Sequence, residues 1–125
     1  MSQELFINVT DAEIRAALMD DTVPMATPPA LLDAEALTTA MEGLAEGWSV
    51  ADGALQRRFT FENFVEAMAF MVEVAFHAER LGHHPNWSNV YGTVDVGIWS
   101  HDAGGITSLC TELAACMDDA AGGST

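Results

Sequence analysis

Lysine is absent from this 125-residue chain, and four arginines stand against 19 acidic residues. The resulting formal net charge of -15 leaves no basic face for a nucleic-acid backbone, so direct nucleic-acid binding is not expected. The same charge opposes attraction to the anionic surface of a membrane. These absences favour small molecules or other proteins as partners.

Long apolar runs are also missing. The most apolar stretch, Val65 to Phe76, is interrupted by two glutamates and falls short of the roughly 20 apolar residues that a membrane-spanning helix needs. No basic residue precedes Arg15, so a secretory signal is not expected. Cys110 and Cys116 are six residues apart on an expected helix and face different directions, which argues against a disulfide or a shared zinc ion. We therefore expect a cytoplasmic protein without a membrane segment.

Half of the residues are hydrophobic, which is enough for one core in a chain of this length. Prolines gather between Thr22 and Pro29 and mark a linker. We expect residues 1–30 to form an N-terminal extension that includes a short helix over 11–19, followed by one domain over 31–120. Residues 121–125 are expected to be a flexible tail.

Apolar periodicity and turn residues predict the elements of the domain. Helices are expected over 34–44, closed by Gly47, over 62–81, ended by Gly82, and from Thr107 to about 120. Strands are expected over 48–50, 55–61, 87–91 and 94–100, the first two joined at Asp52-Gly53. The order α-β-β-α-β-β-α predicts an α+β fold, in which three helices cover one face of a four-stranded antiparallel sheet.

The long central helix carries two apolar stripes. The first is expected to pack on the sheet and consists of Phe64, Val65, Met68, Met71, Val72 and Ala75. The second is expected to form a helix-to-helix contact between copies of the chain and consists of Ala67, Phe70, Val74, Ala78 and Leu81. The alternative is that another helix of the same chain covers this second stripe.

Three histidines lie at predicted element ends, His83 and His84 after the long helix and His101 after the last strand. Helical spacing places Glu79, one turn before His83, along the sheet-facing stripe; taken alone, the preferred interpretation is that Glu79 sits in the last turn and reaches water. His-Glu-x-x-His spacing is absent, which disfavours a metal site, and so are nucleophile and phosphate-loop motifs. General acid-base catalysis by imidazole remains, because a histidine with a pKa of about 6.5 can donate or accept a proton near neutral pH.

The pattern Glu79-x-x-x-His83-His84-Pro85, followed by Tyr91 and His101, resembles the signature of the pterin-4a-carbinolamine dehydratases, also called dimerization cofactors of a homeodomain transcription factor. The resemblance includes the segments 47–48, 59–64 and 101–107 and covers about 31–120. The family fold agrees with the predicted order of elements. Family members form dimers and tetramers, so the resemblance implies a homodimer or homotetramer.

The resemblance implies dehydration of 4a-hydroxytetrahydropterin (4a-hydroxytetrahydrobiopterin) to quinonoid dihydropterin, a hydro-lyase step in tetrahydrobiopterin recycling that uses no cofactor or metal. The reaction needs a proton delivered to the leaving C4a hydroxyl and one removed from N5, which two imidazoles can perform. By match to the family pattern, His83 and His101 are the expected acid-base pair, His84 binds or polarises the pterin, and Glu79 orients a histidine or holds the pterin ring. The expected substrate-binding residues are Glu79, Pro85, Trp87, Tyr91 and Asp102.

Cys110 stands where the family pattern has an aspartate, three residues after Thr107. Our preferred interpretation is that this aspartate completes a capping box with the threonine, so that its loss affects helix stability only; the alternative is that it takes part in the chemistry. For the whole chain, the competing hypothesis is a catalytically weak member that binds or assembles a protein partner through its helical face. Retention of all three histidines favours the enzyme.

Overall fold

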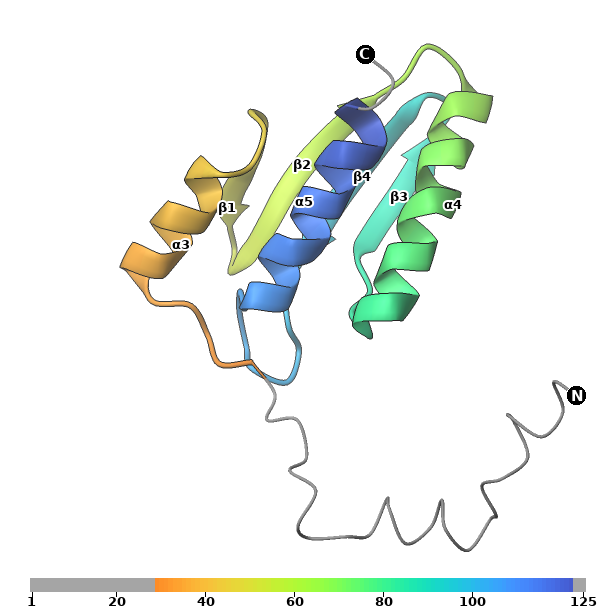
Figure 1. Cartoon of the computed structure of the whole chain (residues 1–125). Coiled ribbons are helices and arrows are strands. Elements are labelled where there is room, and N and C mark those ends of the chain that lie inside the picture. The colour runs from red at the N-terminus through yellow and green to blue at the C-terminus, as the bar shows by residue number, and fades with distance from the viewer. Residues whose placement is uncertain (1–28, 123–125) are drawn as a thin grey trace, which may run out of the picture.

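Four antiparallel strands form a sheet whose one face is covered by three helices (Figure 1), in a computed structural model that describes residues 29–122. The predicted short helix over 11–19 and most of the linker lie outside the described residues. In chain order the elements are α3 (Ala34–Glu42), β1 (Ser49–Ala51), β2 (Ala54–Thr60), α4 (Phe64–Leu81), β3 (Asn86–Val90), β4 (Thr93–Ile98) and α5 (Ser108–Gly122). The predicted α+β architecture and element order are confirmed.

Local signals account for most element ends. The Asp33 carboxylate accepts from the Ala36 backbone N–H at 2.7 Å and begins α3. This helix ends at Glu42 with Gly43 as its cap, so the prediction that Gly47 closes it was wrong. Asp52 and Gly53 both have positive φ, as the tight β1–β2 turn requires.

The strands lie in the order β1-β2-β4-β3, so the two hairpins meet along β2 and β4. Alternate residues of these strands face the helices and form the core with α4 and α5. Fully or nearly fully buried residues of these strands are Ala54, Leu55, Phe59, Val94, Val96 and Ile98. The other face of the sheet is polar and carries an exposed ion pair between Arg58 and Asp95 at 2.6 Å.

The orientation of α4 is the reverse of the prediction. Its buried residues are Ala67, Phe70, Val74 and Ala78, whereas Phe64, Val65, Met68 and Val72 are exposed. The buried stripe has small residues near both of its ends, which let the helix approach its neighbours, and its one large ring, Phe70, packs against Phe59 and Phe61 at 4.7 and 5.0 Å between centroids. The stripe expected between copies of the chain is therefore covered from within one copy.

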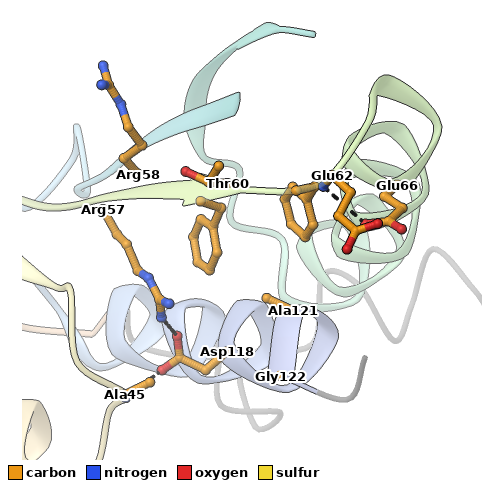
Figure 2. A pocket seen from close by; sticks show the side chains of 11 residues that line it. Ala45, Arg57, Arg58, Thr60, Glu62, Glu66, Asp118, Ala121 and Gly122 are labelled. Carbon is orange, nitrogen blue, oxygen red and sulfur yellow. Dashed lines mark hydrogen bonds and ion pairs between the residues drawn. The ribbon is translucent and has the colours of Figure 1, made fainter. Parts of the chain in front are cut away.

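Asp118 of α5 ties the first hairpin to the last helix. Its carboxylate accepts from the Ala45 backbone N–H, the Trp48 indole N–H and the Arg57 guanidinium at 2.6–2.8 Å. Figure 2 shows Arg57 reaching from β2 toward Asp118 beside a cavity of about 490 Å³. None of the predicted site residues lines this cavity, so we do not take it as the functional site.

Candidate functional site

The three candidate histidines meet at one end of the sheet. Gly82 ends α4 in the left-handed region with φ of 64°, and the following N–H of His83 bonds back to the Ala78 carbonyl at 3.0 Å. This turn brings His83 and His84 to the start of β3. Asn86 at that start pairs with Gly97 near the end of β4, and so His101, which follows β4, lies at the same end.

A cavity of about 380 Å³ opens between these segments, a volume that suits a small ligand. Its lining residues are Gly82, His83, His84, Pro85, Asn86, Trp99, Ser100, His101 and Asp102. A second cavity of about 530 Å³ shares Gly82, His83, Ser100 and Asp102 with the first and adds apolar residues that include Leu31 and Leu109. The structure thus joins the predicted residues His83, His84, Pro85, His101 and Asp102 around one space.

Glu79 reaches this site from the last full turn of α4, but by a different route from the one predicted. Its carboxylate lies 2.7 Å from His84 Nε2, and both side chains are mostly exposed. The placement of Glu79 along a sheet-facing stripe was wrong, since the buried side of the helix is the other one, and the preferred interpretation, that Glu79 reaches water, is confirmed. The pair fixes the His84 ring at the rim of the cavity.

His83 is the least solvent-exposed of the three histidines. Burial lowers its pKa below the ordinary value of 6.5, and the neighbouring imidazoles of His84 and His101 lower it further. His83 is therefore neutral near pH 7 and can accept a proton. Its Nε2 lies 3.3 Å from the Sγ of Cys110.

Cys110 occupies the first turn of α5 and is completely buried. The Thr107 backbone N–H donates to its sulfur at 3.4 Å, so the thiol takes the place of the acidic partner in the predicted capping arrangement. Because the same sulfur contacts His83, the helix cap and the histidine site share this residue. Cys116 lies elsewhere on the helix, with its sulfur 3.7 Å from Arg80 Nη2, and both thiols are free.

Trp99 is a site residue that the sequence analysis missed. It lines the histidine cavity, and its ring lies 4.9 Å from the His101 imidazole. The sequence carried a signal for this residue, because Trp99 and His101 are two positions apart in an extended segment and so point to the same side.

Trp87 and Tyr91 are not among the residues that line the two cavities. Trp87 pairs with Val96 on the helix-covered side of the sheet and packs against the core. Tyr91 lies in the β3–β4 turn with 80% of its surface exposed. The length of β3 separates this turn from the histidines within one chain.

Among residues 29–122, no three histidine, cysteine, aspartate or glutamate side chains converge as a group that could hold a metal ion. None of the helices in this part of the chain has the length and apolar character needed to cross a membrane. The groups that the cavity does offer are imidazoles, a carboxylate, an indole and a hydroxyl, and the imidazoles and the carboxylate suit proton transfer.

A sequence model described as "Pterin 4 alpha carbinolamine dehydratase" matches residues 30–120. A Bradyrhizobium sp. (strain BTAi1) protein provisionally named pterin-4-alpha-carbinolamine dehydratase is 55% identical over 89 residues, which cover 70% of this chain and 89% of the relative. A Mesorhizobium japonicum protein with the same provisional name is 52% identical over 94 residues, covering 74% and 95% of the two chains.

A crystal structure from Brucella melitensis is also similar. It is described as a transcriptional coactivator/pterin dehydratase, has 36% sequence identity and superposes with a TM-score of 0.69. The match covers 73% of this chain and 98% of that one. Sequence and fold thus agree over the segment that carries the histidine cavity.

Proposed function

Because this chain belongs to the pterin 4-alpha-carbinolamine dehydratase family, we propose that it removes water from 4a-hydroxytetrahydropterin to give quinonoid dihydropterin. The observation that carries the proposal is that His83, His84 and His101 line one cavity of about 380 Å³. In this role the protein recycles tetrahydrobiopterin in the cytoplasm as a hydro-lyase that needs no cofactor.

His83 acts as the base and His101 as the acid. The lowered pKa of His83 keeps its imidazole neutral, which suits removal of the N5 proton. The His101 imidazole lines the same cavity beside the Trp99 ring, with 4.9 Å between ring centroids, and is assigned to deliver a proton to the leaving hydroxyl. Both protons then move without a covalent intermediate.

His84, Pro85 and Asp102 of the cavity bind and polarise the pterin, and Glu79, which does not line the cavity, acts through His84. Glu79 accepts from His84 Nε2, which leaves His84 Nδ1 free to accept from the pterin ring. Pro85 and Asp102 line the same space and are assigned to substrate binding. Trp87 and Tyr91, which the family pattern implied, do not line the cavity and are left without a role in this proposal.

The test is a dehydration assay with chemically generated 4a-hydroxytetrahydropterin. Wild-type protein is expected to accelerate the reaction, and His83→Ala or His101→Ala to lose most of a contribution of about 10²- to 10⁴-fold. His77→Ala is the matched control, because His77 lies on α4, contacts Arg80 and does not line the cavity. Wild-type rates equal to buffer would overturn the proposal.

Chelation separates this mechanism from a metal site. Added EDTA should leave the rate unchanged, because the mechanism uses imidazoles alone. Loss of activity with EDTA and recovery with zinc would require the histidines to be reassigned as metal ligands.

The second part of the proposal concerns assembly. A patch on α4 leaves large apolar side chains exposed, between 39% and 75% of their surface: Phe64, Val65, Met68, Val72 and Phe76. We propose that this α4 patch joins copies of the chain into a homodimer or homotetramer. The competing candidate, a different protein partner at the same patch, is favoured by the coactivator description of the Brucella melitensis relative.

A further inference from the structure

The thiol of Cys110 contacts the proposed catalytic base. Its Sγ lies 3.3 Å from His83 Nε2, and the residue is completely buried. The sulfur is also held by Thr107, whose backbone N–H donates to it at 3.4 Å and whose hydroxyl oxygen lies 3.7 Å away. The start of α5 therefore fixes the sulfur, and the sulfur in turn contacts the imidazole.

This contact distinguishes the two imidazole nitrogens of His83. Because Nε2 is engaged by sulfur, Nδ1 is the nitrogen through which His83 can exchange a proton with a ligand. A base needs a lone pair on that nitrogen, so the ring proton must sit on Nε2 and point at Sγ. The thiol proton then turns to the hydroxyl oxygen of Thr107, which accepts it.

The groups around His83 determine how readily its imidazole becomes charged. The titratable groups that face it are His84 and His101, the Cys110 thiol, and Asp102, which lines the same cavities. No carboxylate hydrogen-bonds to His83 in the described part of the chain, and Glu79 is bound to His84 instead. An uncharged thiol orients the ring without the attraction that a carboxylate would exert on an imidazolium.

We propose that Cys110 is a positioning residue that holds His83 in the Nε2–H tautomer through an uncharged hydrogen bond and leaves the Nδ1 lone pair for the substrate. This inference rests on the proposed function, in which His83 removes the N5 proton. The proton taken up at Nδ1 creates an imidazolium, whose Nε2–H continues to donate to Sγ. The imidazolium then releases the proton on Nδ1 to solvent water, and the ring regains its starting tautomer.

Side-chain nitrogen NMR over a pH titration tests the arrangement without reference to activity. His83 is assigned by comparison with His83→Gln, and the variants compared are Cys110→Ser, Cys110→Ala and Cys110→Asp. We expect the Nε2–H tautomer in wild type and in Cys110→Ser, and a mixture of tautomers in Cys110→Ala. In Cys110→Asp the carboxylate should stabilise the imidazolium, so the His83 midpoint should move to higher pH. Cys116→Ala, which removes the thiol beside Arg80, should match wild type.

The kinetic arm uses the same variants. Cys110→Ala should lower kcat about tenfold with KM little changed, because the misplaced base affects the chemical step. Cys110→Ser should stay within about threefold of wild type. In Cys110→Asp the acidic limb of the pH–rate profile should move to higher pH, a change that a merely structural role would not produce.

A wild-type His83 in the Nδ1–H tautomer, or an unchanged His83 midpoint in Cys110→Asp, would overturn the inference. If Cys110→Ala fails to fold, Cys110→Ser and Cys110→Asp carry the test alone, since both keep a polar group beside Thr107. Wild-type rates equal to buffer would overturn the proposed function, whereas the NMR titration would still decide whether Cys110 orients His83.

Discussion

His83 combines a partly buried position with two neighbouring imidazoles and a thiol. Each of these neighbours is uncharged or positively charged when protonated, so none of them favours a proton on His83. The consequence extends from catalysis to stability, because a group whose pKa differs between the folded and unfolded states links folding to pH.

The stability of the protein should therefore fall on the acid side through His83. Burial and the two imidazoles lower its pKa in the folded chain from the ordinary value of 6.5, so the unfolded state binds more protons below that value. The contribution of His83 is complete above about pH 6.5 and is lost as pH falls from there through the folded-state pKa.

The measurement is the melting temperature between about pH 7.5 and 5 for wild type and His83→Gln. Wild type should lose melting temperature relative to the variant as pH falls, because glutamine carries no titrating proton. The repulsion among the acidic residues of this chain, whose net charge is -15, falls with pH in both proteins, so it cancels in the difference between their melting temperatures. Parallel curves for the two proteins would contradict the assigned shift.

At the scale of elements, the end of α4 places the histidines. Gly82 adopts φ of 64°, and its N–H and that of His83 bond to carbonyls of the last helical turn. A Cβ at Gly82 would meet no atom within 4 Å, so the requirement for glycine comes from the backbone conformation and not from crowding. The position of His83 relative to α4 therefore depends on the backbone conformation of Gly82.

Gly82→Ala should lower the free energy of unfolding by about 1 kcal/mol, because an L side chain disfavours the left-handed region. Gly82→Asn should lose less, since asparagine tolerates that region better. Urea denaturation of the two variants and wild type gives the comparison. Equal stability of Gly82→Ala and wild type would show that the turn relaxes to another conformation.

At the scale of the whole molecule, α4 is a helix with two apolar faces, only one of which is covered by other residues of the described segment 29–122. Phe70 is 4% exposed and packs on rings of β2 and the β2–α4 connection. Phe76, on the same helix, is 74% exposed within the α4 patch. One phenylalanine of the helix is buried and the other is exposed. Substitutions at the two positions can therefore distinguish an effect on folding from an effect on assembly.

Phe76→Glu should leave the fold intact and reduce the mass of the particle in light scattering, because a charge in the α4 patch opposes association. Phe70→Glu is the matched comparison and should unfold the chain, since burying a carboxylate among aromatic rings costs several kcal/mol. An unchanged mass for folded Phe76→Glu would remove the α4 patch as the contact between copies.

The sequence by itself determined the order of elements and the meeting of the histidines. The Asp33 cap, the Asp52-Gly53 turn and the Gly82 end are local signals that depend on a few neighbouring residues. Antiparallel pairing then follows from short connections, and it brings the ends of β4 and α4 together whatever the details of packing.

Only the tertiary structure decided which face of α4 is buried and what touches His83. Periodicity identifies an apolar stripe, but the choice between two stripes depends on the shape of a sheet built from residues far along the chain. That choice sent Glu79 outward to His84 and placed Cys110, 27 residues away in sequence, against His83. Tyr91 is separated from the histidines because it follows the far end of β3, whereas His83 and His84 precede the start of that strand.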